Sequence, residues 1–428
     1  MTGSSSTLDR RRLSADVPLL FATRAIRLFA YGFLAVVLVL YLVELGFSES
    51  RIGLLLTATL LGDTAISLWM TTRADRVGRR RMLLLGTALM FAGGAGFAAA
   101  QVFWALLIAA TLGVISPSGN EVGPFLALEQ AALAQTVPPE RRTGAFAWYS
   151  LAGSFSTALG SLAGGAVAEG LQRMGIAPVT SYRWILLAYA AAGALLLLLA
   201  SRLSPAVEAP PSERREGRPA FLQTTLGLHR SRSVVFRLAS LFTVDAFAGG
   251  FVVQSFVAYW FHQRFGADPA QLGAIFFGAN VLAGVSALSA AWVARRIGLV
   301  RAMVFTHLPS NVLLFLVPLM PSLASAIAIL LLRFSISQMD VPTRQSYTLA
   351  VVDPDERSAA AGITGIARTV GASLAPVAAG PLYANPALAG IPFFIAGALK
   401  AAYDLVLYRS FRSLTPPEER AGEPSRAR

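Results

Sequence analysis

Cysteine is absent from the 428-residue sequence, and charged side chains make up only 14% of it. Without cysteine the chain can form neither a disulfide framework nor a thiolate metal site. A soluble protein carries about a quarter charged residues, whereas 55% of the residues here are hydrophobic. Apolar windows of roughly 20 residues, each long enough to cross a bilayer as a helix, recur along nearly the whole chain. The composition therefore predicts a polytopic helical membrane protein.

The positive net charge of the chain, +13 at pH 7, is divided among short arginine clusters between the apolar segments. Nucleic-acid binders gather their basic residues into one patch or stripe, so we expect no nucleic-acid partner. Short arginine-rich loops stay in the cytoplasm, and alternation of the segments puts nearly all of these clusters on one side. We therefore expect both termini to be cytoplasmic and the membrane to be the inner (plasma) membrane. The polar, basic start of the chain predicts no cleaved signal peptide.

The apolar segments predict an all-α membrane protein with twelve transmembrane helices. Their expected ranges are 20–45, 51–73, 82–100, 103–136, 143–169, 184–203, 236–260, 272–294, 302–320, 323–351, 358–382 and 390–408. The fourth and tenth are longer than one crossing needs. We expect them to extend beyond the bilayer or to bend at Pro117, Pro124 and Pro342.

A segment rich in proline and charge separates the first six helices from the last six. It predicts an N-terminal tail (1–19), a six-helix bundle (20–203), a cytoplasmic linker (204–235), a second bundle (236–408) and a C-terminal tail (409–428). An internal repeat supports this division, because LGFSESRIG (45–53) aligns with FGADPAQLG (265–273) at an offset of 220. The same offset places DRVGRRR (75–81) on RRIGLVR (295–301). Two similar bundles are therefore expected.

The loop DRVGRRR resembles the signature between the second and third helices of the major facilitator superfamily. Asp75, Arg76, Gly78, Arg79 and Arg80 match that signature, while threonine stands at the place of its first glycine. The resemblance implies two pseudo-symmetric bundles, a solute path between them and transport by alternating access. It also implies a gate formed by these residues, in which Asp75 faces the positive N-terminal end of helix eleven when the protein opens outward.

The segment GSLAGG (160–165) is similar, apart from one serine, to the end of the fifth-helix motif of drug–proton antiporters. Small residues at a spacing of four allow close helix packing in lipid, and we favour packing over a role in the direction of transport. The arginine that many proton-coupled exporters carry in the fourth helix is missing here. The resemblance to the antiporter branch is therefore partial.

Ionisable residues inside a span are costly and usually face a cavity or a partner. The repeat pairs Glu121 with Asp340, each beside a proline. The resemblance implies that helices one, four, seven and ten line the central path. The expected substrate and proton pathway comprises Glu121, Asp340, Arg344, Asp245, Glu129, Arg368, Tyr31 and Gln254.

Two pairs of opposite charges are spaced by four residues and so share a helix face. Asp340 and Arg344 can move protons, touch substrate, or latch helix ten to helix eleven through Arg368. Lys400, the one lysine of the sequence, and Asp404 are expected to form a structural ion pair.

These features predict a secondary active transporter of a small organic solute, with proton-coupled efflux as the first interpretation. The alternative is an uptake symporter or facilitator of a small metabolite. A non-transporting membrane sensor needs a sizeable soluble domain, and an enzyme needs a nucleophile–base or metal constellation; neither is evident. We expect a monomer with no cofactor apart from a proton gradient, and no metal site, because the three histidines are scattered. The charges permit cations, zwitterions or neutral organic molecules as substrate.

Overall fold

The computed structural model describes residues 4–121, 123–208, 228–353, 356–412 and 414. Every regular element in these ranges is a helix, and nine of the described helices are long and apolar enough to cross a membrane. The remaining three crossings are the fourth and tenth, each split into two shorter helices, and the more polar eleventh. The predicted twelve-helix membrane fold is confirmed. Most of the predicted linker, and the ends of both tails, lie outside the described residues.

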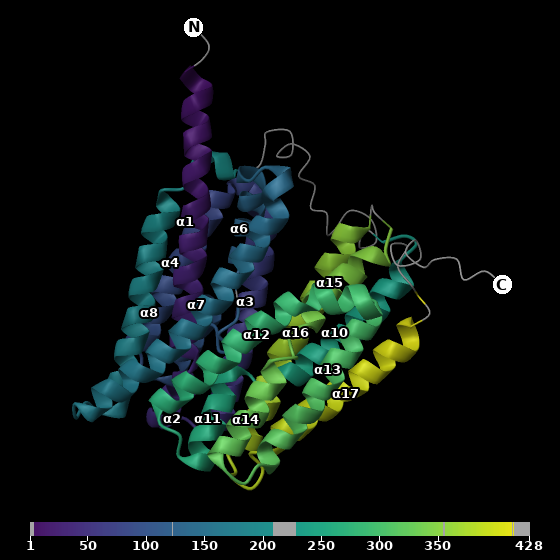
Figure 1. Ribbon diagram of the computed structural model, residues 1–428. Helices are drawn as coiled ribbons and strands as arrows, with labels where there is room; N and C mark the ends of the chain where they lie inside the picture. Colours follow the sequence, from purple (N-terminus) through teal and green to yellow (C-terminus); the bar gives the residue numbers. More distant parts are fainter. Residues whose placement is uncertain (1–3, 122, 209–227, 354–355, 413, 415–428) are drawn as a thin grey trace, which may run out of the picture.

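Two halves of the chain repeat the same order of helices (Figure 1). The first half contains α1 (Ser4–Ala35), α2 (Leu38–Glu44), α3 (Glu49–Val77), α4 (Arg79–Ala99), α5 (Phe103–Leu112), α6 (Phe125–Thr136), α7 (Pro139–Arg173), α8 (Pro178–Ser201) and the short η1 (Pro205–Val207). The second half contains α10 (Arg232–Gly250), α11 (Gln254–Phe265), α12 (Pro269–Ile297), α13 (Leu299–Leu316), η3 (Val317–Leu319), α14 (Leu323–Phe334), α15 (Asp340–Ala350), α16 (Arg357–Tyr383) and α17 (Ile391–Phe411).

Crossings one, four, seven and ten, the first of each successive group of three, each consist of two helices separated by an interruption. The interruptions follow α1, α5, α10 and α14, at residues 36–37, 113–124, 251–253 and 335–339. The longest contains Pro117, Pro124 and two glycines with positive φ, Gly119 (69°) and Gly123 (82°). Pro342 lies in the first turn of α15, where its missing N–H costs no helical hydrogen bond. Breaks therefore occur near the prolines at which bends were predicted.

The two halves lie side by side, touching at the end where α2, α11 and α14 lie and diverging toward the end that holds α6 and α15 (Figure 1). We call the diverging end the basic end, because it holds the arginine-rich loop 76–81 and its repeat at 295–301. Hydrogen bonds between the halves occur at the other end. Tyr259 donates to Glu49 (2.6 Å), and the backbone N–H of Val377 donates to Thr57 Oγ1 (3.0 Å).

Two helix crossings at this contacting end depend on glycine. A Cβ on Gly165 of α7 would lie 2.1 Å from the carbonyl oxygen of Pro269 in α12, and one on Gly273 would lie 3.1 Å from the Gly165 Cα. A Cβ on Gly380 of α16 would lie 2.4 Å from the Glu49 carbonyl oxygen and 3.2 Å from the Gly53 Cα in α3. The repeat aligns Gly53 with Gly273. The halves therefore meet through two equivalent crossings.

The glycines of the fifth crossing also pack within the first half. A Cβ on Gly160 would lie 2.0 Å from the carbonyl oxygen of Phe29, and one on Gly164 would lie 2.2 Å from that of Phe33. The α1 and α7 backbones thus approach closely because both positions lack a side chain. This is the packing role that we favoured for this segment.

Candidate functional site

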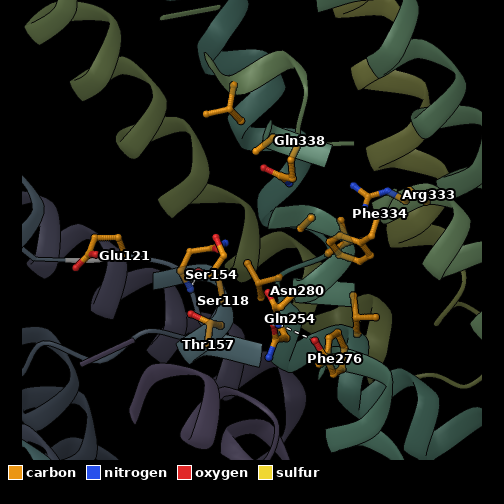
Figure 2. Close-up of a pocket in the computed structure, with 18 of the residues that line it drawn as sticks. Ser118, Glu121, Ser154, Thr157, Gln254, Phe276, Asn280, Arg333, Phe334 and Gln338 are labelled. Carbon is orange, nitrogen blue, oxygen red and sulfur yellow. Dashed lines mark hydrogen bonds between the residues drawn. The ribbon is translucent and has the colours of Figure 1, made fainter. Parts of the chain in front are cut away.

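A cavity of about 710 Å³ lies between the two halves. The first half contributes hydroxyl and amide groups from the interruption of the fourth crossing and from α7, and the second half contributes Gln254 and Asn280. Figure 2 shows Glu121 on one side of this space, Arg333 on the other, and Ser118, Ser154, Thr157, Gln254 and Asn280 between them. Asn280 donates to Gln254 (3.3 Å), and Gln254 donates to Ser161 Oγ of α7 (3.3 Å). We call these hydrogen-bonded side chains and their polar neighbours the polar floor of the cavity. It joins both halves.

Two acids of the first half are held by two arginines of α1. Glu121 accepts from Arg24 Nη1 (2.6 Å) and Arg27 Nε (2.8 Å), and 13% of its side-chain surface remains exposed. Glu129 is buried, and both of its oxygens accept from Arg27, at 2.7 and 2.6 Å. Thr23 and Tyr149 also donate to Glu129. This cluster contains as many acids as cations, so its charges balance.

One acid of the second half is shared by cations from three helices. Asp245 of α10 accepts from Lys400 Nζ of α17 (2.6 Å) and from Arg368 Nη1 of α16 (3.2 Å). Arg344 of α15 reaches the same carboxylate at 3.4 Å and its own-helix partner Asp340 at 2.6 Å. Burial of a charge is costly unless partners surround it. Asp245 therefore binds together the four helices on which these side chains lie.

The second half also contains a cation that faces the cavity without an acidic partner. Arg333, at the end of α14, lines the cavity, and its guanidinium stacks 4.9 Å from the centre of the Phe334 ring. Its Nε is buried and has no hydrogen-bond partner. Among the described residues, no carboxylate lies within ion-pair distance of Arg333.

The structure divides the residues predicted for the pathway into two groups. Glu121, Gln254, Arg344 and Arg368 line the cavity. The other four lie behind its wall and are buried: Glu129, Asp245, Asp340 and Tyr31. Tyr31 was expected to face the path; instead it stacks on Tyr189 inside the first half, with ring centres 6.3 Å apart.

The predicted pairing of Lys400 with Asp404 is wrong. Lys400 binds Asp245, while Asp404 accepts from Asn311 (2.8 Å) and lies 2.9 Å from His307 Nδ1. A spacing of four along one helix allowed contact, but the neighbouring helices α10 and α13 offered better partners. Asp340 and Arg344 do form the pair that their spacing predicts.

The predicted gating loop, residues 75–80, makes its ion pair and hydrogen bonds within the first half. Gly78 has φ 112°, a conformation open to glycine, and Asp75 binds Arg79 Nε at 3.0 Å while 52% of its side chain is exposed. The backbone N–H groups of Arg79 and Arg80 donate to Glu208 at 2.7 and 3.3 Å. Because the halves diverge here, the contact of Asp75 with helix eleven stays a prediction for the outward-open state.

The second half has a comparable carboxylate outside the membrane, just before α16. Glu356 accepts from the backbone N–H groups of His229, Arg230 and Ser231 ahead of α10. The Ser231 hydroxyl and these N–H groups stabilise the carboxylate and lower the pKa of Glu356 from 4.5 to about 2.

Sequence reasoning missed the cations of α1 and the polar pair of α13. Arg24 and Arg27 are three residues apart in the first apolar segment, so they share a helix face. Charges at that depth within an apolar segment are the signal that indicates this cluster. His307 and Asn311 are four apart in the ninth segment, and nothing in the sequence relates them to Asp404.

Comparisons with known proteins agree with this geometry. The family model described as Major Facilitator Superfamily matches residues 20–376. The chain belongs to the major facilitator superfamily. It is also 31% identical over 419 residues to the uncharacterized membrane protein YJR124C of Saccharomyces cerevisiae, covering 92% of this chain and 93% of that protein.

Solved structures of this superfamily share the fold. A structure of the nucleoside transporter NupG matches with a TM-score of 0.74 and 14% identity, covering 92% of this chain and 99% of that one. The D-xylose-proton symporter matches at 0.70 with 17% identity, covering 94% and 98%. The human organic anion transporter MFSD10 matches at 0.61 with 19% identity, covering 93% and 99%. As a member of this superfamily, the chain is a multi-pass membrane transporter.

Proposed function

We propose that this superfamily member moves a small organic solute through the cavity between its halves, in a cycle coupled to protons. The cavity is the observation that carries the proposal. It lies between two pseudo-symmetric halves, is lined by both, and has a volume in the range of about 300–1,000 Å³ that is typical of small-molecule sites. The halves touch through paired glycine crossings at one end and diverge at the other.

Alternating access follows if the two halves rock about the site. With cytoplasmic termini, the basic end is the inner one, and the arrangement is inward-facing. Closing the inner side brings the loop that contains Asp75 toward α16, while opening the outer side separates the glycine crossings. The family members with similar folds carry nucleosides, xylose and organic anions, which supports a small organic solute here.

Glu121 is the acid best placed to carry the coupled proton. It is the one acid among the described residues that line the cavity, and it sits in the interrupted fourth crossing between two arginines. A proton entering through the cavity reaches this carboxylate first, whereas Glu129, Asp245 and Asp340 are buried behind the wall. Efflux is the first interpretation of the transport direction and uptake the alternative, so the test must report direction.

Proteoliposomes test the proposal with a mixture of candidate solutes. Vesicles with and without the protein are given one mixture of metabolite-sized neutral, cationic and anionic compounds under a pH gradient imposed in either direction. Mass spectrometry of the vesicle contents is expected to find a compound that accumulates only with protein and only under a gradient. Accumulation while protons flow outward indicates antiport, and accumulation while they flow inward indicates symport. Identical contents in both vesicle sets contradict the proposal.

A further inference from the structure

The charges that line the cavity are unequal in sign. Five lining residues of the described chain are cationic, namely Arg24, Arg333, Arg344, Arg368 and Lys400, and one is acidic, Glu121. Lining cations at this depth in a membrane protein require partners, because an unpaired charge in a low-dielectric surrounding is costly. The question is which of the five have enough negative charge beside them.

Most of the five are paired inside the protein. Arg24 binds Glu121 at 2.6 Å, Lys400 binds Asp245 at 2.6 Å, and Arg344 binds Asp340 at 2.6 Å. Arg368 shares Asp245 with two other cations and keeps 33% of its side-chain surface exposed.

Arg333 differs from the others because it faces the cavity with no carboxylate of the described residues within ion-pair distance. Stacking on Phe334 holds the guanidinium at the wall, and its buried Nε lacks a hydrogen-bond partner. Figure 2 shows Arg333 across the cavity from Glu121, with amide and hydroxyl groups between them. Asp340 and Asp245 act on Arg333 only from beyond ion-pair distance, so its guanidinium is free to bind an anion in the cavity.

We infer that the transported solute is a small organic anion, whose acidic group binds Arg333 and Arg368 in the second half. Guanidinium groups bind carboxylate, sulfonate or phosphate oxygens through paired donors. The uncharged part of the solute lies on the polar floor, where Gln254, Asn280 and Thr157 offer hydrogen bonds. This inference rests on the proposed function and names the substrate class of the same cavity.

An anionic substrate also fixes the sign of coupling to protons. Protonation of Glu121 removes the lining negative charge and makes the cavity more positive, so the anion binds more tightly. Linkage is reciprocal, so bound anion favours the protonated acid. Proton and anion then move together, which is symport, the alternative that the sequence left open. The charged and titratable groups that act on Glu121 are Arg24, Arg27, Glu129, Asp63 and Tyr31.

The cysteine-free sequence permits a direct test of the cavity potential. Ala283 of α12 lines the cavity, and Ala387 lies exposed in the turn between α16 and α17. Purified full-length Ala283→Cys and Ala387→Cys proteins are labelled with methanethiosulfonates that carry either a sulfonate or a trimethylammonium group. The ratio of the two rates at Ala283→Cys is divided by the ratio at Ala387→Cys, which removes the intrinsic reactivity of the reagents.

We expect the sulfonate reagent to be favoured in the cavity by roughly tenfold, the lower end of focusing effects on rates. Arg333→Gln should remove most of this preference, and Arg333→Gln with Arg368→Gln should remove all of it. Arg296→Gln is the matched control, because Arg296 stacks on Trp292 at 4.1 Å and does not line the cavity. A preference below about threefold at Ala283→Cys, or one that survives the double substitution, overturns the inference.

The proteoliposome experiment separates this inference from the proposed function. Compounds that accumulate are expected to carry an acidic group, and Arg333→Gln should raise their KM more than it lowers kcat. If the compounds that accumulate are neutral or cationic, the substrate class is wrong while the transport function stands. If nothing accumulates but the labelling preference is present, transport fails and the anion-selective cavity stands.

Discussion

The two halves share one helix order but arrange their buried charges differently. In the first half, two arginines of α1 neutralise two acids of the fourth crossing, and one of those acids reaches the cavity. In the second half, Asp245 is surrounded by cations from three other helices, and Arg333 has no acid of the described residues within ion-pair distance at the cavity wall. The first half is therefore balanced, whereas the second half presents positive charge to the cavity.

This difference in charge gives the two halves different roles in the proposed transport cycle. When Glu121 takes up a proton, Arg27 keeps Glu129, whereas Arg24 loses its acidic partner and adds positive charge at the cavity wall. The second half can receive a negatively charged solute because its cations outnumber the acids near them. Pseudo-symmetry of the backbone thus supports an asymmetric pair of sites, one for the proton and one for the solute.

The largest expected effect comes from removing the central acid of the second half. Asp245→Asn leaves Lys400, Arg344 and Arg368 without their common partner, and losing one member of a buried ion pair costs about 3–5 kcal/mol. We expect transport to be lost and the melting temperature of the detergent-purified protein to fall sharply. Glu129→Gln in the balanced cluster should cost less, because only Arg27 loses an acidic partner there and it keeps its pair with Glu121.

The control for this prediction is Glu169→Gln, which removes the peripheral pair with Arg173 on α7. It should leave the melting temperature close to that of the unaltered protein. If Asp245→Asn melts like this control, the description of Asp245 as the link between four helices is wrong.

A second large effect is expected at the two equivalent glycine crossings between the halves. Gly165→Val and Gly380→Val each place a side chain against the backbone of the other half, so both should block closure of the outer side and abolish transport. Gly170→Val on the same helix as Gly165 is the matched control, because nothing lies within 4 Å of its Cβ position. Transport that survives Gly165→Val would contradict the role of this crossing.

A medium effect distinguishes the observed from the predicted partner of Lys400. In a double-mutant cycle, Lys400→Ala with Asp245→Ala should give an interaction free energy of about 0.5–3 kcal/mol. The cycle of Lys400→Ala with Asp404→Ala should give a much smaller value, because Asp404 binds His307 and Asn311. Equal interaction energies in the two cycles would restore the pairing expected from the sequence.

The smallest effect concerns the carboxylate outside the membrane. The pKa of Glu356 is lowered to about 2, so the unfolded chain binds a proton at higher pH than the folded protein does. The stabilisation by Glu356 is therefore complete above pH 4.5 and is lost as the pH falls toward 2. Glu356→Gln should lower the melting temperature at pH 7, and the difference from the unaltered protein should narrow below pH 4.5. A difference that is constant with pH would show that the ionised form of the Glu356 carboxylate does not stabilise the fold.

Most of the fold could be predicted because bilayer-length apolar segments and arginine-rich loops report directly on membrane crossings. The acids of the site could be predicted for a related reason: a charge such as Glu121 stands out within an apolar segment. Their partners could not, because Lys400 reaches Asp245 across 155 positions of sequence. That no carboxylate of the described residues reaches Arg333 could not be predicted either, because it depends on how the helices pack.

Gradient-driven transport by Glu121→Gln tests most directly the proposal that the first half binds the proton and the second half the solute. The neutral side chain imitates the protonated acid, so the variant should still exchange labelled solute between the two sides of a proteoliposome. It should not accumulate that solute when a pH gradient is imposed, whereas the unaltered protein should accumulate it. Accumulation by Glu121→Gln equal to that of the unaltered protein would show that the coupled proton binds elsewhere.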